Sequence, residues 1–264
     1  MKIEGSNYKN KTGYIPLIGK KSDLKAVDFG ILRLKKGRRS SGVFKNKETA
    51  VIILSGKIDM KAGNKSWRSI GKRKDVFSGK AYAFFVPPAC RYEIRARSDA
   101  EIAVCSAPSR AKSLAKLIRP SDVRLRKVGM KNFRRNVYDI IDERTDAQAL
   151  LAGETINAPG NWSSYPPHKH DVDNLPAESK LEEMYFFKLS PSNGFGVMRV
   201  YDNGKMDNIY VLKNNDIVTI PKGYHPVSVI PGYRIYYLWV LAGKKRVLKP
   251  NDDPSYSWVK EVKS

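Results

Sequence analysis

Histidine is scarce in this chain, which has only three in 264 residues. His168 and His170 lie in the stretch Gly160–His170, and His225 ends the stretch Pro221–His225. Histidines placed at random would rarely gather in two short segments. The clustering indicates that both segments serve one site that requires imidazole groups.

Other absences exclude whole classes of protein. The sequence has no apolar run of about 18 residues, so we expect no transmembrane helix, and its first residues lack the apolar core of a secretion signal. Cys90 and Cys105 are the only cysteines, which excludes a disulfide framework or a zinc ribbon and predicts reduced, buried thiols. We therefore expect a cytoplasmic protein without a membrane partner.

Positive charge is concentrated in one half of the chain. The net charge is +23, and residues 1–140 carry 34 lysines and arginines against 11 acidic residues, whereas residues 141–264 carry 15 of each. A basic half of this kind could bind nucleic acid or another polyanion. No nucleic-acid motif accompanies the charge, so we favour a solvated lysine-rich surface that steers anionic ligands.

Short apolar or alternating segments with turn residues between them run through both halves. They predict an all-β fold of sandwich or barrel type. Residues 1–25 are interpreted as a polar surface lead-in, and residues 107–127 as a connector with a short helical turn that Pro120 ends. The expected strands include 28–34, 50–54, 57–61, 81–86, 91–97, 101–105, 184–189, 195–201, 208–212, 216–220, 226–230 and 233–241.

The two halves resemble a weak internal repeat. Each contains an apolar strand that ends in a proline turn, at 86–88 and at 220–221. Ala89 stands where the second half has Gly223, and Tyr92 stands where it has His225. Residues 1–140 contain no histidine. The first copy therefore cannot form the same site, and we expect a structural role for it, such as covering an edge or closing a homodimer.

The histidines and a nearby carboxylate have the chemistry of a metal site. His168 and His170 are two residues apart, so on a β-strand both side chains point to one face. A carboxylate from Glu182 or Glu183 and the imidazole of His225 would complete a set of ligands for a divalent ion. An isolated pair of histidines is more often structural, but the combination favours a metal.

The spacing of these residues resembles the paired motifs of the cupin superfamily. A closer similarity is to the family of 5-deoxy-glucuronate isomerases of myo-inositol catabolism, which are related to the 5-keto-4-deoxyuronate isomerases. The similarity extends over nearly the whole chain and is most specific in the run Trp-Ser-Ser-Tyr-Pro-Pro-His-Lys-His. The runs that carry it are 161–171, 181–186, 194–201 and 221–226, together with 32–34, 54–56, 86–88 and 104–108.

The resemblance implies two cupin-type jelly-roll β-barrels in tandem. The first would span 1–107 and lack metal ligands, 108–130 would connect, and 131–264 would form the metal-binding barrel. The implied ligands of one divalent ion (Zn, Mn or Fe) are His168, His170, Glu183 and His225. The family's ligand glutamate precedes an x-Tyr pair, which favours Glu183 over Glu182.

The implied reaction is an aldose–ketose isomerisation of 5-deoxy-D-glucuronate to 5-dehydro-2-deoxy-D-gluconate. The ion would act as a Lewis acid, and a base must move a proton from C2 to C1. The chemistry of the side chains selects Tyr185, Tyr237 and Lys169 for catalysis, with Tyr201 and Asp171 as further candidates for the base. The substrate, a small anionic sugar acid, needs a cation. Arg199 is our first choice because its guanidinium matches a carboxylate, with Tyr201 and Trp162 beside it.

Two other functions remain open from the sequence. A metal-dependent oxygenase on the same barrel would share the ligands but need iron and O2. A sugar- or polyanion-binding bicupin without activity would instead show salt-sensitive binding through the basic half.

Overall fold

The computed structural model describes residues 1–261. This part of the chain consists of β-strands with the short 3-10 helices η1 (Gly5–Asn7), η2 (Lys131–Phe133) and η3 (Ser257–Lys260). It forms two compact units. The C-terminal unit contains 1–7, 125–138 and the chain from 153 onward, and the N-terminal unit contains 8–124 and 139–152. None of the helices in the described residues is long and apolar enough to cross a membrane.

The larger sheet of the C-terminal unit has the strand order β1-β20-β17-β22-β14-β13-β12. β17 and β22 pair antiparallel along their full length and are buried, as their apolar and aromatic sequences predict. The strands are β1 (Lys2–Ile3), β12 (Arg124–Val128), β13 (Arg135–Ile141), β14 (Leu150–Asn157), β17 (Glu182–Ser190), β20 (Ile217–Ile220) and β22 (Arg234–Ala242).

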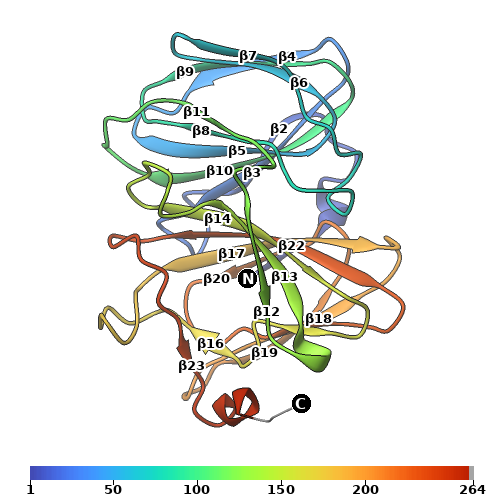
Figure 1. The fold of residues 1–264 in the computed structure, drawn as a ribbon, viewed down its shortest axis with the longest axis vertical. Helices are drawn as coiled ribbons and strands as arrows, with labels where there is room; N and C mark the ends of the chain where they lie inside the picture. The colour runs from blue at the N-terminus through green and yellow to red at the C-terminus, as the bar shows by residue number, and fades with distance from the viewer. Residues whose placement is uncertain (262–264) are drawn as a thin grey trace. The chain divides into compact units, whose positions relative to one another are not determined.

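A second layer faces this sheet within the same unit (Figure 1). Its strands have the order β15-β21-β18-β19, and a separate pair is formed by β16 and β23. Their bounds are β15 (Trp162–Ser163), β16 (His168–Lys169), β18 (Gly196–Tyr201), β19 (Asp207–Leu212), β21 (Val227–Val229) and β23 (Asn251–Asp252).

The N-terminal unit repeats this plan. One sheet has the order β11-β8-β5-β10-β3-β2 and the other has the order β4-β9-β6-β7. The strands are β2 (Gly13–Ile18), β3 (Asp28–Leu34), β4 (Arg39–Val43), β5 (Lys47–Ser55), β6 (Ile58–Ala62), β7 (Lys65–Ile70), β8 (Ala83–Val86), β9 (Arg91–Ala96), β10 (Ala100–Pro108) and β11 (Lys116–Ile118). The two-sheet architecture of both units confirms the predicted all-β fold with two cupin-type barrels.

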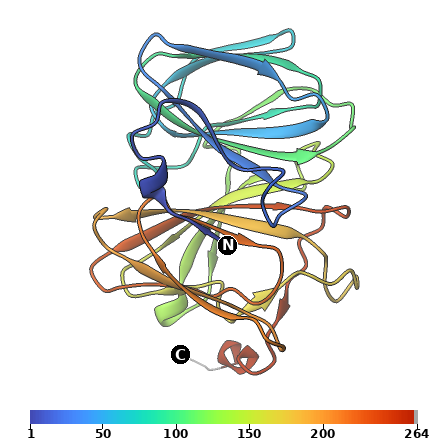
Figure 2. The same cartoon turned by 180° about the vertical axis from the view of Figure 1, so that it is seen from behind.

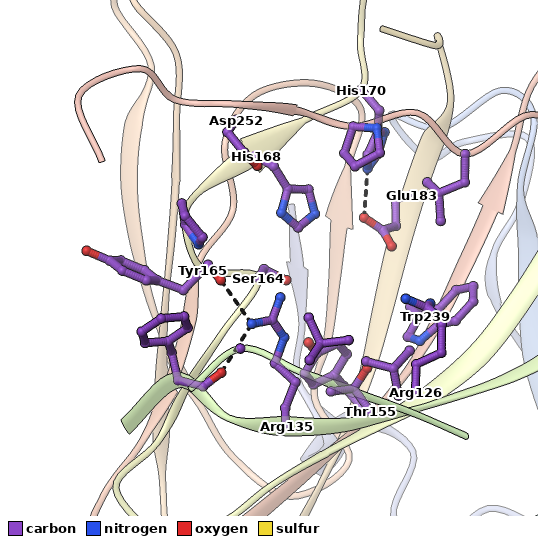
Figure 3. A pocket seen from close by; sticks show the side chains of 18 of the residues that line it. Arg126, Arg135, Thr155, Ser164, Tyr165, His168, His170, Glu183, Trp239 and Asp252 are labelled. Carbon is purple, nitrogen blue, oxygen red and sulfur yellow. Dashed lines mark hydrogen bonds and ion pairs between the residues drawn. The ribbon is translucent and has the colours of Figure 1, made fainter. Parts of the chain in front are cut away.

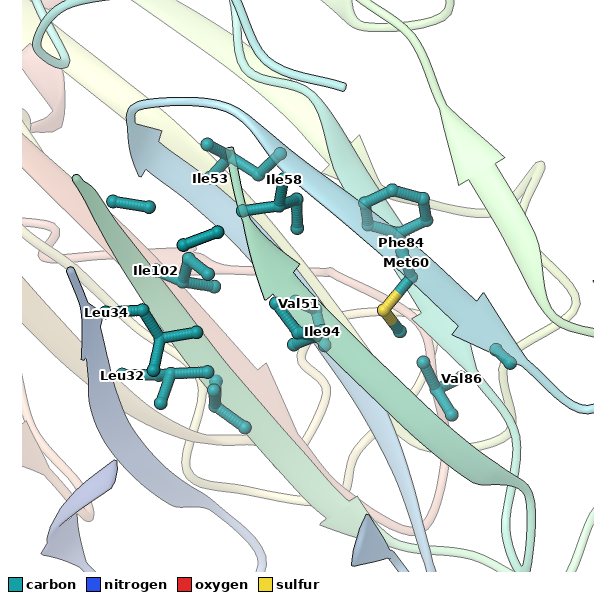
Figure 4. Packing of buried hydrophobic residues seen from close by; sticks show 14 of the residues in the cluster. Leu32, Leu34, Val51, Ile53, Ile58, Met60, Phe84, Val86, Ile94 and Ile102 are labelled. Carbon is teal, nitrogen blue, oxygen red and sulfur yellow. The ribbon is translucent and has the colours of Figure 1, made fainter. Parts of the chain in front are cut away.

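The interior of the N-terminal unit is filled with apolar side chains (Figure 4). They come from β3, β5, β8 and β10 in one sheet and from β6 and β9 in the other, where alternate residues face inward. The largest contributors include Leu32, Ile53, Met60, Phe84 and Ile94, each at most 2% exposed. The space between these sheets is therefore a packed core.

The first residues are not the surface lead-in that their polarity predicted. Ile15 and Ile18 are buried on β2, which pairs with β3. β1 adds to the sheet of the C-terminal unit beside β20, where the N-terminus lies in Figure 2. An ion pair of 2.9 Å between Lys2 and Asp216 supports this pairing. An edge strand buries the apolar residues of one face only, and the polar residues between them hid this pattern in the sequence.

The expected helical turn near Pro108 is also wrong. Residues 110–115 have no regular structure, and 116–118 form β11 against β8. Leu117 and Ile118 are buried there. Pairing with β8 covers both side chains, whereas a helical turn would have left one of them exposed. Thus 108–118 contributes to the N-terminal unit.

Candidate metal centre

Three separate segments of the C-terminal unit bring histidine and glutamate to one cavity. β16 pairs with β23 at His168, and His170 follows directly after β16. The ring of His170 is fixed because its Nδ1 lies 2.8 Å from the carbonyl oxygen of Leu181. Glu183 is the second residue of β17, and His225 lies in the segment between β20 and β21.

The ligand atoms of His170, Glu183 and His225 lie within 4.8 Å of one another. The Oε2 atom of Glu183 is 3.0 Å from Nε2 of His170 and 3.2 Å from Nε2 of His225 (Figure 3 shows the first contact). Glu183 is 4% exposed and His225 is fully buried. Glu182, its neighbour, is only partly buried, so the geometry favours Glu183 as the ligand.

The hydrogen bonds of the two rings direct Nε2 of each toward Glu183. Nδ1 of His225 lies 2.9 Å from the carbonyl oxygen of Gly223, as Nδ1 of His170 lies near that of Leu181. A carbonyl accepts a hydrogen bond, so each Nδ1 carries the proton and each Nε2 is free to bind a metal. Nε2 of His225 is buried, and its 3.2 Å contact with Glu183 lacks the geometry of a hydrogen bond. A cation between these three atoms would satisfy this nitrogen, so the residues fit a metal.

Protonation at this cluster follows from the same contacts. Burial works to raise the pKa of Glu183, but the imidazoles of His170 and His225 outweigh it and lower the pKa to about 2. Burial works to lower the pKa of His170, and the bond to Glu183 outweighs it and raises that pKa. A divalent ion would take the place of the proton that His170 shares with Glu183.

His168 lies beside this cluster but is not one of the three residues whose ligand atoms lie within 4.8 Å of one another. Its ring centroid is 4.9 Å from that of His225 and 6.4 Å from that of His170. Burial, followed by the two neighbouring imidazoles, lowers the pKa of His168 well below its usual value. A neutral imidazole in this position is available as a fourth ligand.

The cluster lines a cavity of about 470 Å³ within the C-terminal unit. Strands β12, β13, β17 and β22 contribute to its walls, as do the segment 164–166 and β23. The lining includes Arg126, Val128, Phe133, Arg135, Val137, Thr155, Ser164, Tyr165, His168, His170, Glu183, Tyr185, Tyr237, Trp239, Leu241, Asp252 and Lys260. The cavity thus combines metal-ligating groups, hydroxyl groups and positive charge.

Two of the three side chains predicted to be catalytic lie in this cavity. The hydroxyl of Tyr185 is 3.0 Å from Oγ of Ser164, and that of Tyr237 is 2.5 Å from Oγ of Ser163. Burial raises the pKa of Tyr185 well above its usual value, so this hydroxyl keeps its proton near neutral pH. Tyr185 is therefore suited to donating a hydrogen bond.

Lys169, the third, is directed away from the cavity. Its Nζ atom lies 2.6 Å from Asp171 and 2.8 Å from both carboxylate oxygens of Glu178. Neighbouring residues on a strand face opposite sides, so Lys169 cannot accompany the histidines that flank it. Asp171 also accepts a hydrogen bond from the Gly223 backbone, so this cluster ties the two histidine segments together.

Arg199, Tyr201 and Trp162 line a different cavity, of about 440 Å³, in the same unit. Arg199 donates to both oxygens of Asp207, at 2.7 and 2.9 Å, and lies 4.0 Å above the Tyr201 ring. Arg199 was predicted to bind the substrate carboxylate; it lies outside the cavity that contains the histidines, and Asp207 on the paired strand β19 holds its guanidinium. The hydroxyl of Tyr201 donates to Asp253.

Arg135 is a cation of the histidine cavity that the sequence reasoning missed. It lies on β13 with Val137, and both line the cavity because alternate residues of a strand share a face. The alternation of side chains along a strand could have placed Arg135 and Val137 on the same face of β13. The sequence could not have shown that this face points into the cavity.

Comparison with known proteins places these observations in a family. The model of the KduI/IolB family matches residues 3–259. This chain belongs to the KduI/IolB family. It is 45% identical over 239 residues to the 5-deoxy-glucuronate isomerase of Geobacillus kaustophilus (strain HTA426), covering 90% of this chain and 87% of that protein. It is 40% identical over 243 residues to that of Bacillus subtilis subsp. natto, covering 91% and 90%.

Solved structures agree with this assignment. An IolB-like protein from Salmonella typhimurium LT2 superimposes with a TM-score of 0.92 and 31% identity, covering 95% of this chain and 97% of that protein. An oxalate decarboxylase from Lactobacillus farciminis superimposes with a TM-score of 0.68 at 11% identity, covering 92% and 84%. The latter is similar in fold alone.

Proposed function

We propose that this chain is a metal-dependent aldose–ketose isomerase of inositol catabolism that converts 5-deoxy-D-glucuronate to 5-dehydro-2-deoxy-D-gluconate. Membership of the KduI/IolB family and the names of the relatives support the reaction. The observation in the structure that carries the proposal is the convergence of His170, Glu183 and His225 on one point in a cavity large enough for a sugar acid.

We further propose that His168, His170, Glu183 and His225 hold one divalent ion. Three neutral imidazoles and one carboxylate fit Zn, Mn or Fe. A bound ion would supply Lewis acidity toward the carbonyl and the adjacent hydroxyl of the substrate. The buried Nε2 of His225 supports this assignment, because a buried polar atom without a partner is costly unless a ligand satisfies it.

The tyrosines of the cavity have separate proposed roles. The Tyr185 hydroxyl keeps its proton and donates a hydrogen bond to a substrate oxygen. Tyr237 carries the proton: its phenolate oxygen takes the proton from C2 and becomes the hydroxyl, and the return of that proton to C1 restores the phenolate, which the hydrogen bond with Ser163 stabilises. Lys169 has no place in this scheme, since two carboxylates hold it outside the cavity.

The setting of the reaction is part of the same proposal. The substrate is a small anionic sugar acid, the location is the cytoplasm, and the N-terminal unit has a structural role that extends to a homo-oligomer. The basic residues of 1–140 form a solvated surface that does not bind nucleic acid.

Nuclear magnetic resonance of the reaction tests the proposal directly. The purified protein is incubated with 5-deoxy-D-glucuronate before and after chelation, and its metal content is measured by elemental analysis. We expect loss of the aldehyde signal and growth of a ketone signal, with both stopping on chelation and resuming when a divalent ion is restored. Bound metal without turnover, or turnover that needs O2 and iron, would contradict the isomerase.

A further inference from the structure

The histidine cavity contains a guanidinium for which the structure shows no carboxylate partner. Three cations line it: Arg126, Arg135 and Lys260. Lys260 pairs with Asp252, and Arg126 is exposed on β12. Arg135 is half-buried, and within the described residues no carboxylate oxygen lies within 4.0 Å of its guanidinium nitrogens. A buried charge is normally neutralised, so Arg135 needs an explanation.

Backbone carbonyls orient this guanidinium without neutralising it. Nη1 of Arg135 donates to the carbonyl oxygens of Phe133, at 3.2 Å, and of Tyr165, at 2.9 Å. Figure 3 shows the side chain directed into the cavity, on the side of His168 and Glu183. A guanidinium has five N–H groups in a fixed fork. These two bonds use one nitrogen and leave Nε and Nη2 for a ligand.

The surroundings of Arg135 favour an anion. Burial, which disfavours the charged form, lowers the pKa of the guanidinium, although Tyr237, Tyr185 and Asp252 act to raise it; the like charge of Arg126 acts in the same direction as burial. Both effects would be relieved by a carboxylate that pairs with the fork. The two carboxylates of the cavity have other partners, since Oε2 of Glu183 faces His170 and His225 and Asp252 pairs with Lys260.

We infer that Arg135 binds the carboxylate of the sugar acid and so directs its aldehyde end toward His170, Glu183 and His225. This inference rests on the proposed isomerase function and names its substrate anchor. Arg135 is thus the residue that selects an acid over a neutral sugar. It replaces Arg199, whose guanidinium Asp207 occupies in the other cavity.

Steady-state kinetics of Arg135→Gln and Arg135→Lys test the assignment, with 5-deoxy-D-glucuronate and the neutral 5-deoxy-D-glucose as substrates. We expect Arg135→Gln to lower kcat/KM for the acid by about 10²- to 10³-fold, mainly through KM, and to change turnover of the neutral sugar little. Lysine should restore only part of the loss, because it keeps the charge without the fork. Metal content should stay at the wild-type value.

Matched variants make the result specific. Arg39→Gln, a change at an exposed ion pair of the N-terminal unit, removes the same charge and should leave the kinetics unchanged. Arg199→Gln tests the competing anchor. A large loss in Arg199→Gln with near-wild-type preference for the acid in Arg135→Gln would overturn the inference, as would an equal loss for the acid and the neutral sugar.

A binding measurement separates this inference from the reaction. Trp239 lines the cavity, so its fluorescence can report titration with 5-deoxy-D-glucuronate whether or not turnover occurs. Quenching in the wild type that is lost in Arg135→Gln supports the anchor even if no ketone forms, in which case only the proposed function fails. Equal quenching in both proteins contradicts the anchor even if the wild type is active.

Discussion

The two units share a strand plan but differ in what lies between their sheets. The orders β8-β5-β10-β3 and β20-β17-β22-β14 correspond position by position, as do β4-β9-β6-β7 and β15-β21-β18-β19. The N-terminal unit fills its interior with apolar side chains, whereas the C-terminal unit keeps a cavity lined by histidines and tyrosines. One architecture therefore provides a packed core in one unit and a cavity with a candidate metal site in the other.

Strand register shows which substitutions separate them. Glu183 pairs with Ile220, and at the corresponding position Thr49 pairs with Val86. Thr49 is buried, and its hydroxyl is hydrogen-bonded to that of Ser106 at 2.9 Å. A pair of neutral hydroxyl groups therefore stands where the C-terminal unit has the carboxylate of Glu183.

The turn after each proline strand carries the second difference. Ala89 and Gly223 both have positive φ angles, of 59° and 91°, which supports their correspondence. Two residues further on, exposed Arg91 stands in the place of His225. Tyr92, which the sequence comparison put there, is one residue later, and its ring stacks on Phe44 at 4.9 Å. A threonine and an arginine thus occupy the positions of two of the proposed metal ligands, so few side chains separate the packed core of one unit from the candidate metal site of the other.

The largest effect is expected from removing a ligand that only the C-terminal unit has. His225→Ala should lose the metal and reduce turnover by about 10³-fold or more, with the fold intact, because a ligand site needs its full set of donors. Glu183→Gln should also lose metal, whereas Glu182→Gln should retain it. Elemental analysis with circular dichroism checks this, and metal retained in His225→Ala would refute the ligand assignment.

Removing one hydroxyl should separate the tyrosines of the cavity. Tyr237→Phe should lower kcat by about 10²- to 10⁴-fold, as expected for loss of a proton-transfer group, and should stop exchange of the C2 proton in D2O. Tyr185→Phe should lower kcat but retain exchange, since it loses only a donor. Exchange at the wild-type rate in Tyr237→Phe would show that another group carries the proton.

A cavity made in the N-terminal unit should act on stability alone. Ile53 is fully buried in its core, so Ile53→Ala should lower the free energy of unfolding by about 2–5 kcal/mol. Thermal unfolding measures this, and metal content measured on the same sample should equal that of the wild type. Loss of metal together with stability would mean that the core of this unit also supports the site.

The corresponding turns should respond differently to a methyl group. A Cβ at Gly223 would lie 2.6 Å from the carbonyl oxygen of Tyr201, so Gly223→Ala should cost about 1–3 kcal/mol and weaken metal retention through His225. Ala89→Gly reverses the substitution in the other unit and should change stability by less than about 1 kcal/mol. Chemical denaturation of both variants compares them, and equal costs would argue against the correspondence.

Apolar alternation and turn residues predicted most of the strands, and the clustered histidines predicted which segments meet at the candidate metal centre. The polar segments around Ile15 and Leu117 were missed because each edge strand buries only part of its surface. The pairing of Arg199 with Asp207 was not predicted because it depends on the register of β18 and β19, which no local pattern reveals. Arg135 was missed for the same reason: the sequence does not say which face of β13 is the interior.

The metal stoichiometry of the whole chain tests the comparison most directly. Elemental analysis of purified wild type, with His225→Ala prepared in parallel, should give about one divalent ion per chain for the wild type and none for the variant, because only the C-terminal unit has the ligands. Two ions per wild-type chain, or one that persists in His225→Ala, would contradict the account.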